Sequence, residues 1–105
     1  MKEITPTDLS VRLAGGESFV LLDVRENQEL EIVRLDGIVH IPMGEITSRV
    51  GELDPDAPIV CICHHGMRSA SVAGFLEQSD FTNITNLTGG MDRWAAEVDS
   101  SLARY

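Results

Sequence analysis

The chain has 105 residues and a formal net charge of -9. With 43% hydrophobic residues it is long enough for one packed core and too short for two, so we expect a single domain over residues 1–105. The acidic balance removes the long-range attraction that nucleic acid or an anionic membrane would need, and we expect neither as a partner. The absence of an apolar leader or a membrane-length apolar stretch favours a cytoplasmic setting.

The first half of the chain alternates between helical and strand patterns. Thr5, Pro6 and Asp8 form a typical helix start, and Gly15 with Gly16 is expected to close that helix. The elements expected after it are a buried strand at 19–24, a helix at 27–33, a short strand at 38–41 and a helix at 45–53.

The second half continues the alternation. A buried strand is expected at 57–62, a helix from about Arg68, a strand at 83–87 and a closing helix from 91 to about 102, after the turn at Gly89 and Gly90. Strands that alternate with helices are typical of an α/β fold, so we predict a central, mainly parallel sheet flanked by helices. Ligands of such sheets bind beyond the carboxyl ends of the strands.

The segment after the strand at 57–62 concentrates the reactive and charged side chains. In order, it reads Cys63, His64, His65, Gly66, Met67, Arg68 and Ser69. Cys63 ends a buried strand, and the helix that follows would leave its first amides and the positive end of its dipole beside the loop. These surroundings favour a thiolate over a thiol, so the segment predicts a nucleophile in an anion-binding loop.

We therefore assign Cys63 as the catalytic residue and the six residues after it as substrate-binding. The Arg68 guanidinium can donate hydrogen bonds to an oxyanion of the substrate. Gly66 allows a backbone angle or a close anion approach that a Cβ would block. His64 and His65 are both candidates for tuning the thiolate.

Asp23 and Arg25 follow two buried leucines and are expected to support the site, either by bracing the loop or as a plain ion pair at a strand end. Cys61 lies inside an apolar run, which favours an inert core residue over a dithiol partner of Cys63. The cysteines and histidines at 61–65 are too crowded along the chain to form a tetrahedral zinc site. We therefore predict no metal and no other cofactor.

Four segments resemble, in the right order, the motifs of the small single-domain rhodanese-like sulfurtransferases. They read LLDVRE at 21–26, GIVHIP at 37–42, CHHGMRS at 63–69 and NLTGGM at 86–91, with Trp94 after the last. The resemblance implies a rhodanese-like three-layer fold. It also implies that Cys63 takes a sulfane sulfur as a persulfide, from thiosulfate or from a persulfide donor, and passes it to a thiophilic acceptor such as a thiol, on a small molecule or a protein.

Two positions depart from the pattern of that family. Arg34 stands where the family usually has a histidine, and His64 stands where many relatives carry an arginine. Arg68 is then the main fixed positive charge of the loop, so the affinity for thiosulfate is expected to be modest.

Two other functions stay open at this point. One is a catalytically idle rhodanese-like module that binds a partner, although the presence of Cys63, Gly66 and Arg68 together favours an enzyme. The other is a phosphatase or arsenate reductase on a related fold. Those enzymes place five residues between the cysteine and the arginine, whereas Cys63 and Arg68 have four between them. A shorter ring of amides suits one sulfur better than a whole phosphate.

Overall fold

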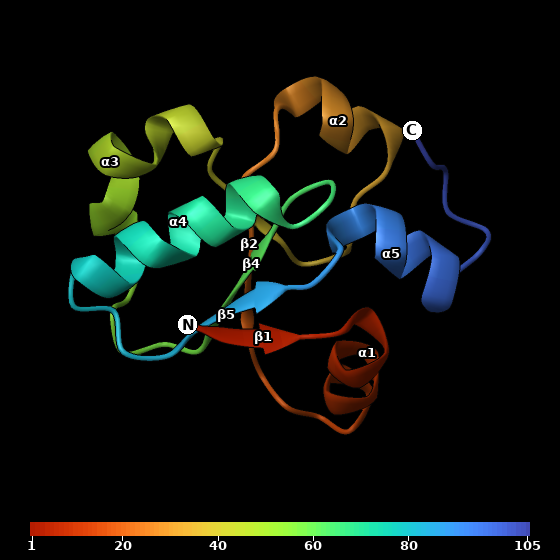
Figure 1. Ribbon diagram of the computed structural model, residues 1–105, viewed down its shortest axis with the longest axis horizontal. Coiled ribbons are helices and arrows are strands. Elements are labelled where there is room, and N and C mark those ends of the chain that lie inside the picture. The colour runs from red at the N-terminus through yellow and green to blue at the C-terminus, as the bar shows by residue number, and fades with distance from the viewer.

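A five-stranded parallel sheet forms the centre of the molecule (Figure 1). The computed structural model describes residues 1–105. The strands are β1 (Lys2–Ile4), β2 (Val20–Asp23), β3 (Val39–His40), β4 (Ile59–Ile62) and β5 (Ile84–Leu87), in the spatial order β1-β5-β4-β2-β3. Every neighbouring pair is parallel. The predicted α/β class with a central parallel sheet is therefore confirmed.

Helices connect the strands and cover the sheet. They are α1 (Pro6–Ala14), α2 (Asn27–Ile32), α3 (Ile46–Arg49), α4 (Met67–Gln78) and α5 (Gly90–Glu97), and short 3₁₀ turns at Met43–Glu45 and Val50–Glu52 flank α3. The start of α1 is as expected, because the Thr5 side chain accepts a hydrogen bond of 3.2 Å from the Asp8 amide. No helix is long and apolar enough to cross a membrane.

The sheet buries side chains on both of its faces, since helices pack on each side (Figure 1). One core lies under α3 and α4 and includes Val72 and Leu76. The other lies under α1 and α5 and includes Leu9 and Trp94. All four residues of β4 are buried, as is typical of a central parallel strand with helices on both faces.

The register of the sheet brings the proposed site residues to the carboxyl ends of the strands. β4 lies between β2 and β5, with Asp23 of β2 opposite Ile62 at the end of β4. Cys63 is the next residue after Ile62. The chain therefore leaves the central strand at its carboxyl end and enters the loop there, where ligands of open α/β sheets bind.

Three details differ from the sequence-based expectations. β1 was not expected, because an edge strand of three residues with only Ile4 buried gives no alternating pattern. The helix expected at 45–53 is broken into two 3₁₀ turns around the single α-turn of α3. The closing helix ends at Glu97 and not near 102, because Asp99 bonds the Ser101 amide through its own side chain and ends the helical pattern.

After α5 the chain turns back along one side of the molecule and ends beside α2 (Figure 1). The Tyr105 hydroxyl donates a hydrogen bond of 2.6 Å to Glu29 of α2. The Tyr105 ring also stacks on His64, so Tyr105 lies beside the loop that follows β4.

Candidate active site

Cys63 is the first residue after β4, and only 1% of it is exposed. It belongs to the same core as Cys61, which precedes it by two residues on the same face of the sheet. Its backbone carbonyl accepts a hydrogen bond of 2.9 Å from the Met91 amide. The thiol is therefore held at the rim of the core and reaches solvent only through the loop around it.

Two hydrogen-bond donors face the Cys63 sulfur. The Gly66 amide donates to Sγ at 3.0 Å, and the Ser69 hydroxyl lies 3.3 Å from the same atom. Ser69 also bonds Asn86 Oδ1 at 2.5 Å, so its single proton serves one of the two acceptors at a time. α4 begins at Met67, and its first amides have no intrahelical acceptor. These groups can stabilise negative charge on sulfur.

The loop is clamped from the neighbouring strand and helix. The Asn86 side chain of β5 donates to the Gly66 carbonyl at 3.1 Å. The amides of Met91 and Asp92, in the first turn of α5, donate to the carbonyls of Cys63 and His64 at 2.9 and 3.0 Å. The amide groups at the start of α5 are therefore used to fix the loop, while the Gly66 amide, directly before α4, bonds the sulfur.

Two glycines make this close approach possible. Gly66 has a φ of 100°, and a Cβ added there would lie 3.1 Å from the Gly89 nitrogen. Gly90 has a φ of 58°, and a Cβ there would lie 2.3 Å from the Cys63 carbonyl oxygen and 2.6 Å from the His64 oxygen. A side chain at either position would have to push the loop after β4 away from α5.

Gly90→Ala is therefore expected to destabilise the protein by about 3 kcal/mol. Alanine is strained in the left-handed conformation of this residue, and its Cβ would clash with two backbone carbonyls. Urea denaturation measures this loss. Gly74→Ala is the matched control, because its added Cβ would meet nothing within 4 Å beyond the backbone of its own helix, and α4 continues through it. It should stabilise by about 0.5 to 1 kcal/mol. Equal stability of the two variants would contradict the proposed clash.

Both loop histidines line a cavity of about 270 Å³, together with Cys63, Met67 and Arg68. The His64 ring lies 3.7 Å from the Tyr105 ring, nearly parallel to it, and 3.9 Å from the His65 ring. Its Nε2 atom is buried without a hydrogen-bond partner. Burial lowers the pKa of His64, which favours the neutral form of the ring. Neither histidine is hydrogen-bonded to the Cys63 sulfur, which is contacted by Gly66 and Ser69 instead.

The rim of the cavity carries Met67 and Arg68. Met67 is 80% exposed. The Arg68 guanidinium, which the sequence assigned to a substrate anion, is bound through both terminal nitrogens to the Glu29 carboxylate, at 2.7 and 2.9 Å. This pairing lowers the pKa of Glu29 to about 2, so the carboxylate is ionised throughout the neutral range.

Asp23 and Arg25 form a fully buried ion pair, with Arg25 donating to both carboxylate oxygens at 2.8 to 3.2 Å. Arg25 also donates to the Val33 carbonyl after α2 and to the Tyr105 hydroxyl. Its own carbonyl is bonded to His40 at 2.6 Å. The pair therefore fixes the segment around α2 and supports the loop only through Tyr105 and Glu29.

Cys61 is fully buried in β4 between β2 and β5. Burial raises the pKa of its thiol to about 12, so it stays protonated at neutral pH. This environment fits the expected inert core residue.

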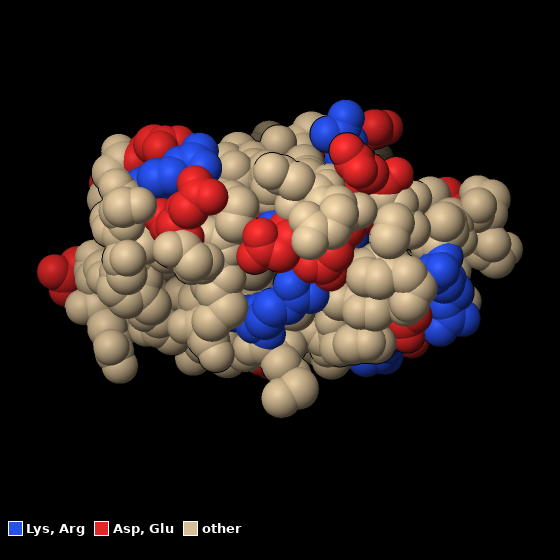
Figure 2. Space-filling model, turned by 90° about the horizontal axis from the view of Figure 1, so that it is seen from above, with Lys and Arg blue, Asp and Glu red and all other residues tan.

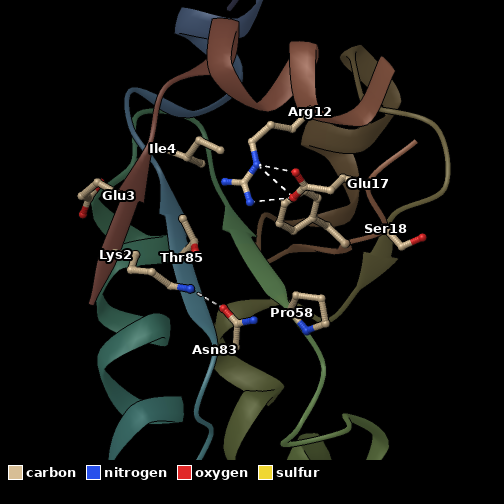
Figure 3. A pocket seen from close by; sticks show the side chains of 10 residues that line it. Lys2, Glu3, Ile4, Arg12, Glu17, Ser18, Pro58, Asn83 and Thr85 are labelled. Atoms are coloured by element: carbon tan, nitrogen blue, oxygen red, sulfur yellow. Dashed lines mark hydrogen bonds and ion pairs between the residues drawn. The ribbon is translucent and has the colours of Figure 1, made fainter. Parts of the chain in front are cut away.

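A second hollow, drawn in Figure 3, lies at the opposite end of the sheet, where the strands begin. Its volume is about 310 Å³. Arg12 donates to Glu17 there at 2.6 Å, and Lys2 is bonded to Asn83. Its charged side chains already have partners, since Glu3 accepts a hydrogen bond from Thr88 besides the two contacts just named, and no cysteine or histidine lines it. We therefore place the candidate site at the loop after β4.

Three residues of this region were not assigned to the site from the sequence: Glu29, Tyr105 and, as a loop clamp, Asn86. Glu29 is 39 residues from Arg68, and Tyr105 is 76 residues from Glu29. No local pattern connects positions so far apart. Of the three, only Asn86 lies in one of the sequence motifs, the NLTGGM segment at 86–91.

Comparisons with known proteins agree with this fold. The model of the rhodanese-like domain family matches residues 5–97. YtwF of Bacillus subtilis, a putative sulfurtransferase, is 37% identical over 98 residues, which are 93% of this chain and 94% of that protein. YrkF of the same organism, a putative sulfur carrier protein, is 35% identical over 97 residues, or 92% of this chain, which spans 52% of that protein.

A crystal structure of a rhodanese-related protein from Thermoplasma volcanium matches with a TM-score of 0.85 and 32% identity, over 93% of this chain and 94% of that one. The family match over residues 5–97 spans the four motif segments at 21–26, 37–42, 63–69 and 86–91. This chain belongs to the rhodanese-like domain family.

Proposed function

We propose that the protein is a sulfurtransferase that carries sulfur as a persulfide on Cys63. The observation that carries the proposal is the hydrogen bond that the Cys63 sulfur accepts from the Gly66 amide. Both residues lie in a loop that β5 and α5 hold in place. A fixed amide beside a sulfur atom stabilises negative charge on it. The relatives named as a sulfurtransferase and a sulfur carrier support the same chemistry.

The transfer proceeds in two displacements. The Cys63 thiolate attacks the outer sulfur of a donor R–S–S⁻, a new S–S bond forms at Sγ, and the donor leaves as its thiolate. With thiosulfate the leaving group is sulfite. A thiophilic acceptor then attacks the outer sulfur of the Cys63 persulfide, takes that sulfur, and leaves Cys63 again as a thiolate. The acceptor that we propose is a thiol, on a small molecule or on a protein.

The hydrogen bonds of Arg68 favour this reaction over phosphate chemistry. A phosphatase loop needs its arginine to hold a tetrahedral oxyanion, whereas both terminal nitrogens of Arg68 are bound to Glu29. The loop has one residue fewer than such enzymes place between cysteine and arginine.

Intact mass spectrometry tests the proposal. After incubation with thiosulfate or glutathione persulfide, the protein should gain the mass of one sulfur atom, and cyanide should remove it as thiocyanate. A chromogenic phosphate ester should not be hydrolysed. A protein that gains no sulfur from any donor and hydrolyses the ester through Cys63 would be a phosphatase. One that does neither would be the idle binding module.

A further inference from the structure

The charge of Arg68 is cancelled inside the protein. Its two terminal nitrogens meet the two carboxylate oxygens of Glu29 in a bidentate pair, and the Glu29 side chain is only 15% exposed against 36% for Arg68. Such a pair is geometrically fixed and has no net charge. The cavity beside Cys63 therefore has an arginine on its rim without the electrostatic field of a free cation.

Tyr105 holds Glu29 in this position. Its hydroxyl donates to Glu29 Oε2 at 2.6 Å and accepts a hydrogen bond of 2.9 Å from Arg25, which is itself fully buried and bound to Asp23. The Tyr105 ring is stacked on His64 of the loop. Glu29 is thus tied to Arg68 on one side and, through Tyr105, to a buried ion pair on the other.

The other charged groups near the loop are matched in the same way. Arg25 is paired with Asp23, Arg104 with Asp92 and Arg93 with Glu97. Figure 2 shows the upper face of Figure 1, where most Lys and Arg side chains lie beside Asp or Glu and form no broad positive patch. Burial lowers the pKa of His64 and so disfavours a positive charge on its ring. The whole chain carries a net charge of -9.

Donors of sulfane sulfur differ in charge. A persulfide R–S–S⁻ has one negative charge at its reacting end, and thiosulfate has two. A dianion gains most from an unpaired arginine and loses most when a carboxylate occupies that arginine. We propose that Glu29, positioned by Tyr105, makes this site select monoanionic persulfide-type donors over dianionic thiosulfate. This inference rests on the proposed sulfur transfer and names its donor class.

Two small donors separate the effect of charge from the effect of chemistry. Thiosulfate and methanethiosulfonate both transfer a terminal sulfur from a sulfonyl sulfur, releasing sulfite and methanesulfinate respectively, but they carry two charges and one. Steady-state kinetics with cyanide as the acceptor should give kcat and KM for each donor. The wild type should have the higher kcat/KM with methanethiosulfonate.

Glu29→Gln keeps the shape of the side chain and removes its charge. It should lower KM for thiosulfate about fivefold to tenfold and change KM for methanethiosulfonate by about half as much on a logarithmic scale, with kcat nearly constant. Tyr105→Phe keeps the stacked ring and removes the hydroxyl, so its effect should have the same direction and be smaller. Glu31→Gln is the matched control, because it removes the same charge from an exposed position of the same helix. It should leave the ratio of the two donors unchanged.

Equal changes with both donors, or a higher KM for thiosulfate in Glu29→Gln, would show that Glu29 only keeps Arg68 in place and would overturn the inference. If Glu29→Gln does not fold, the salt dependence of the wild type still tests the inference. Its kcat/KM for thiosulfate should stay level or rise with added salt. A steep fall with salt would mean an unpaired cation at the site. Failure of the proposed function looks different, since no donor would then leave sulfur on Cys63.

Discussion

Cys63→Ser is expected to lower the rate of sulfur transfer about a thousandfold or more and to abolish the mass gain after incubation with a donor. A serine hydroxyl is not ionised at neutral pH, and it cannot form the S–S bond that carries the sulfur. Serine has the same shape with a smaller oxygen in place of sulfur, and its hydroxyl can accept a hydrogen bond from the Gly66 amide that now bonds Sγ. Loss of activity should therefore occur in a folded protein, as circular dichroism would show.

The same substitution two residues upstream is the matched control. Cys61→Ser should retain most of the transfer rate per folded molecule, because Cys61 lies within the core and its high pKa keeps it a thiol. It should nevertheless destabilise the protein by about 1 to 3 kcal/mol, since it buries a hydroxyl in apolar surroundings. Equal losses of activity in both folded variants would indicate a dithiol mechanism and contradict the single role given to Cys63.

Asp23→Ala is expected to lower the free energy of unfolding by about 3 to 5 kcal/mol, the largest stability effect that we predict. Arg25 is fully buried, and Asp23 accepts three of its side-chain hydrogen bonds. Without the carboxylate, Arg25 would keep only the neutral acceptors at Val33 and Tyr105 for a buried charge. Urea denaturation monitored through Trp94 fluorescence would measure the loss.

Asp36→Ala is the control for this substitution, because Asp36 is exposed in a turn and forms no ion pair. Its effect should stay within about 0.5 kcal/mol. A cost below about 1 kcal/mol for Asp23→Ala would mean that water or another side chain reaches Arg25, and the pair would then be no more than an ordinary ion pair at a strand end.

The amino-acid sequence by itself determined the class of the fold and the position of the loop that we propose as the active site. Runs such as 57–62 predict buried strands from a few adjacent residues, and Thr5 with Pro6 marks the start of α1 in the same local way. The loop at Cys63 was predictable because a buried strand, Gly66 and a helix start follow one another directly. Local preference and periodicity encode such features within a span of ten residues or so.

Tertiary structure alone decided what surrounds the sulfur and which charges are free. β1 forms because β5, about eighty positions later, offers it a partner at Thr85 to Leu87. Arg68 meets Glu29 across 39 positions, and Tyr105 meets Glu29 across 76. These contacts depend on how the helices and the returning chain pack on the sheet, which no short-range pattern specifies. The sequence therefore predicts the nucleophile, whereas the packed fold determines the charge that an approaching donor meets.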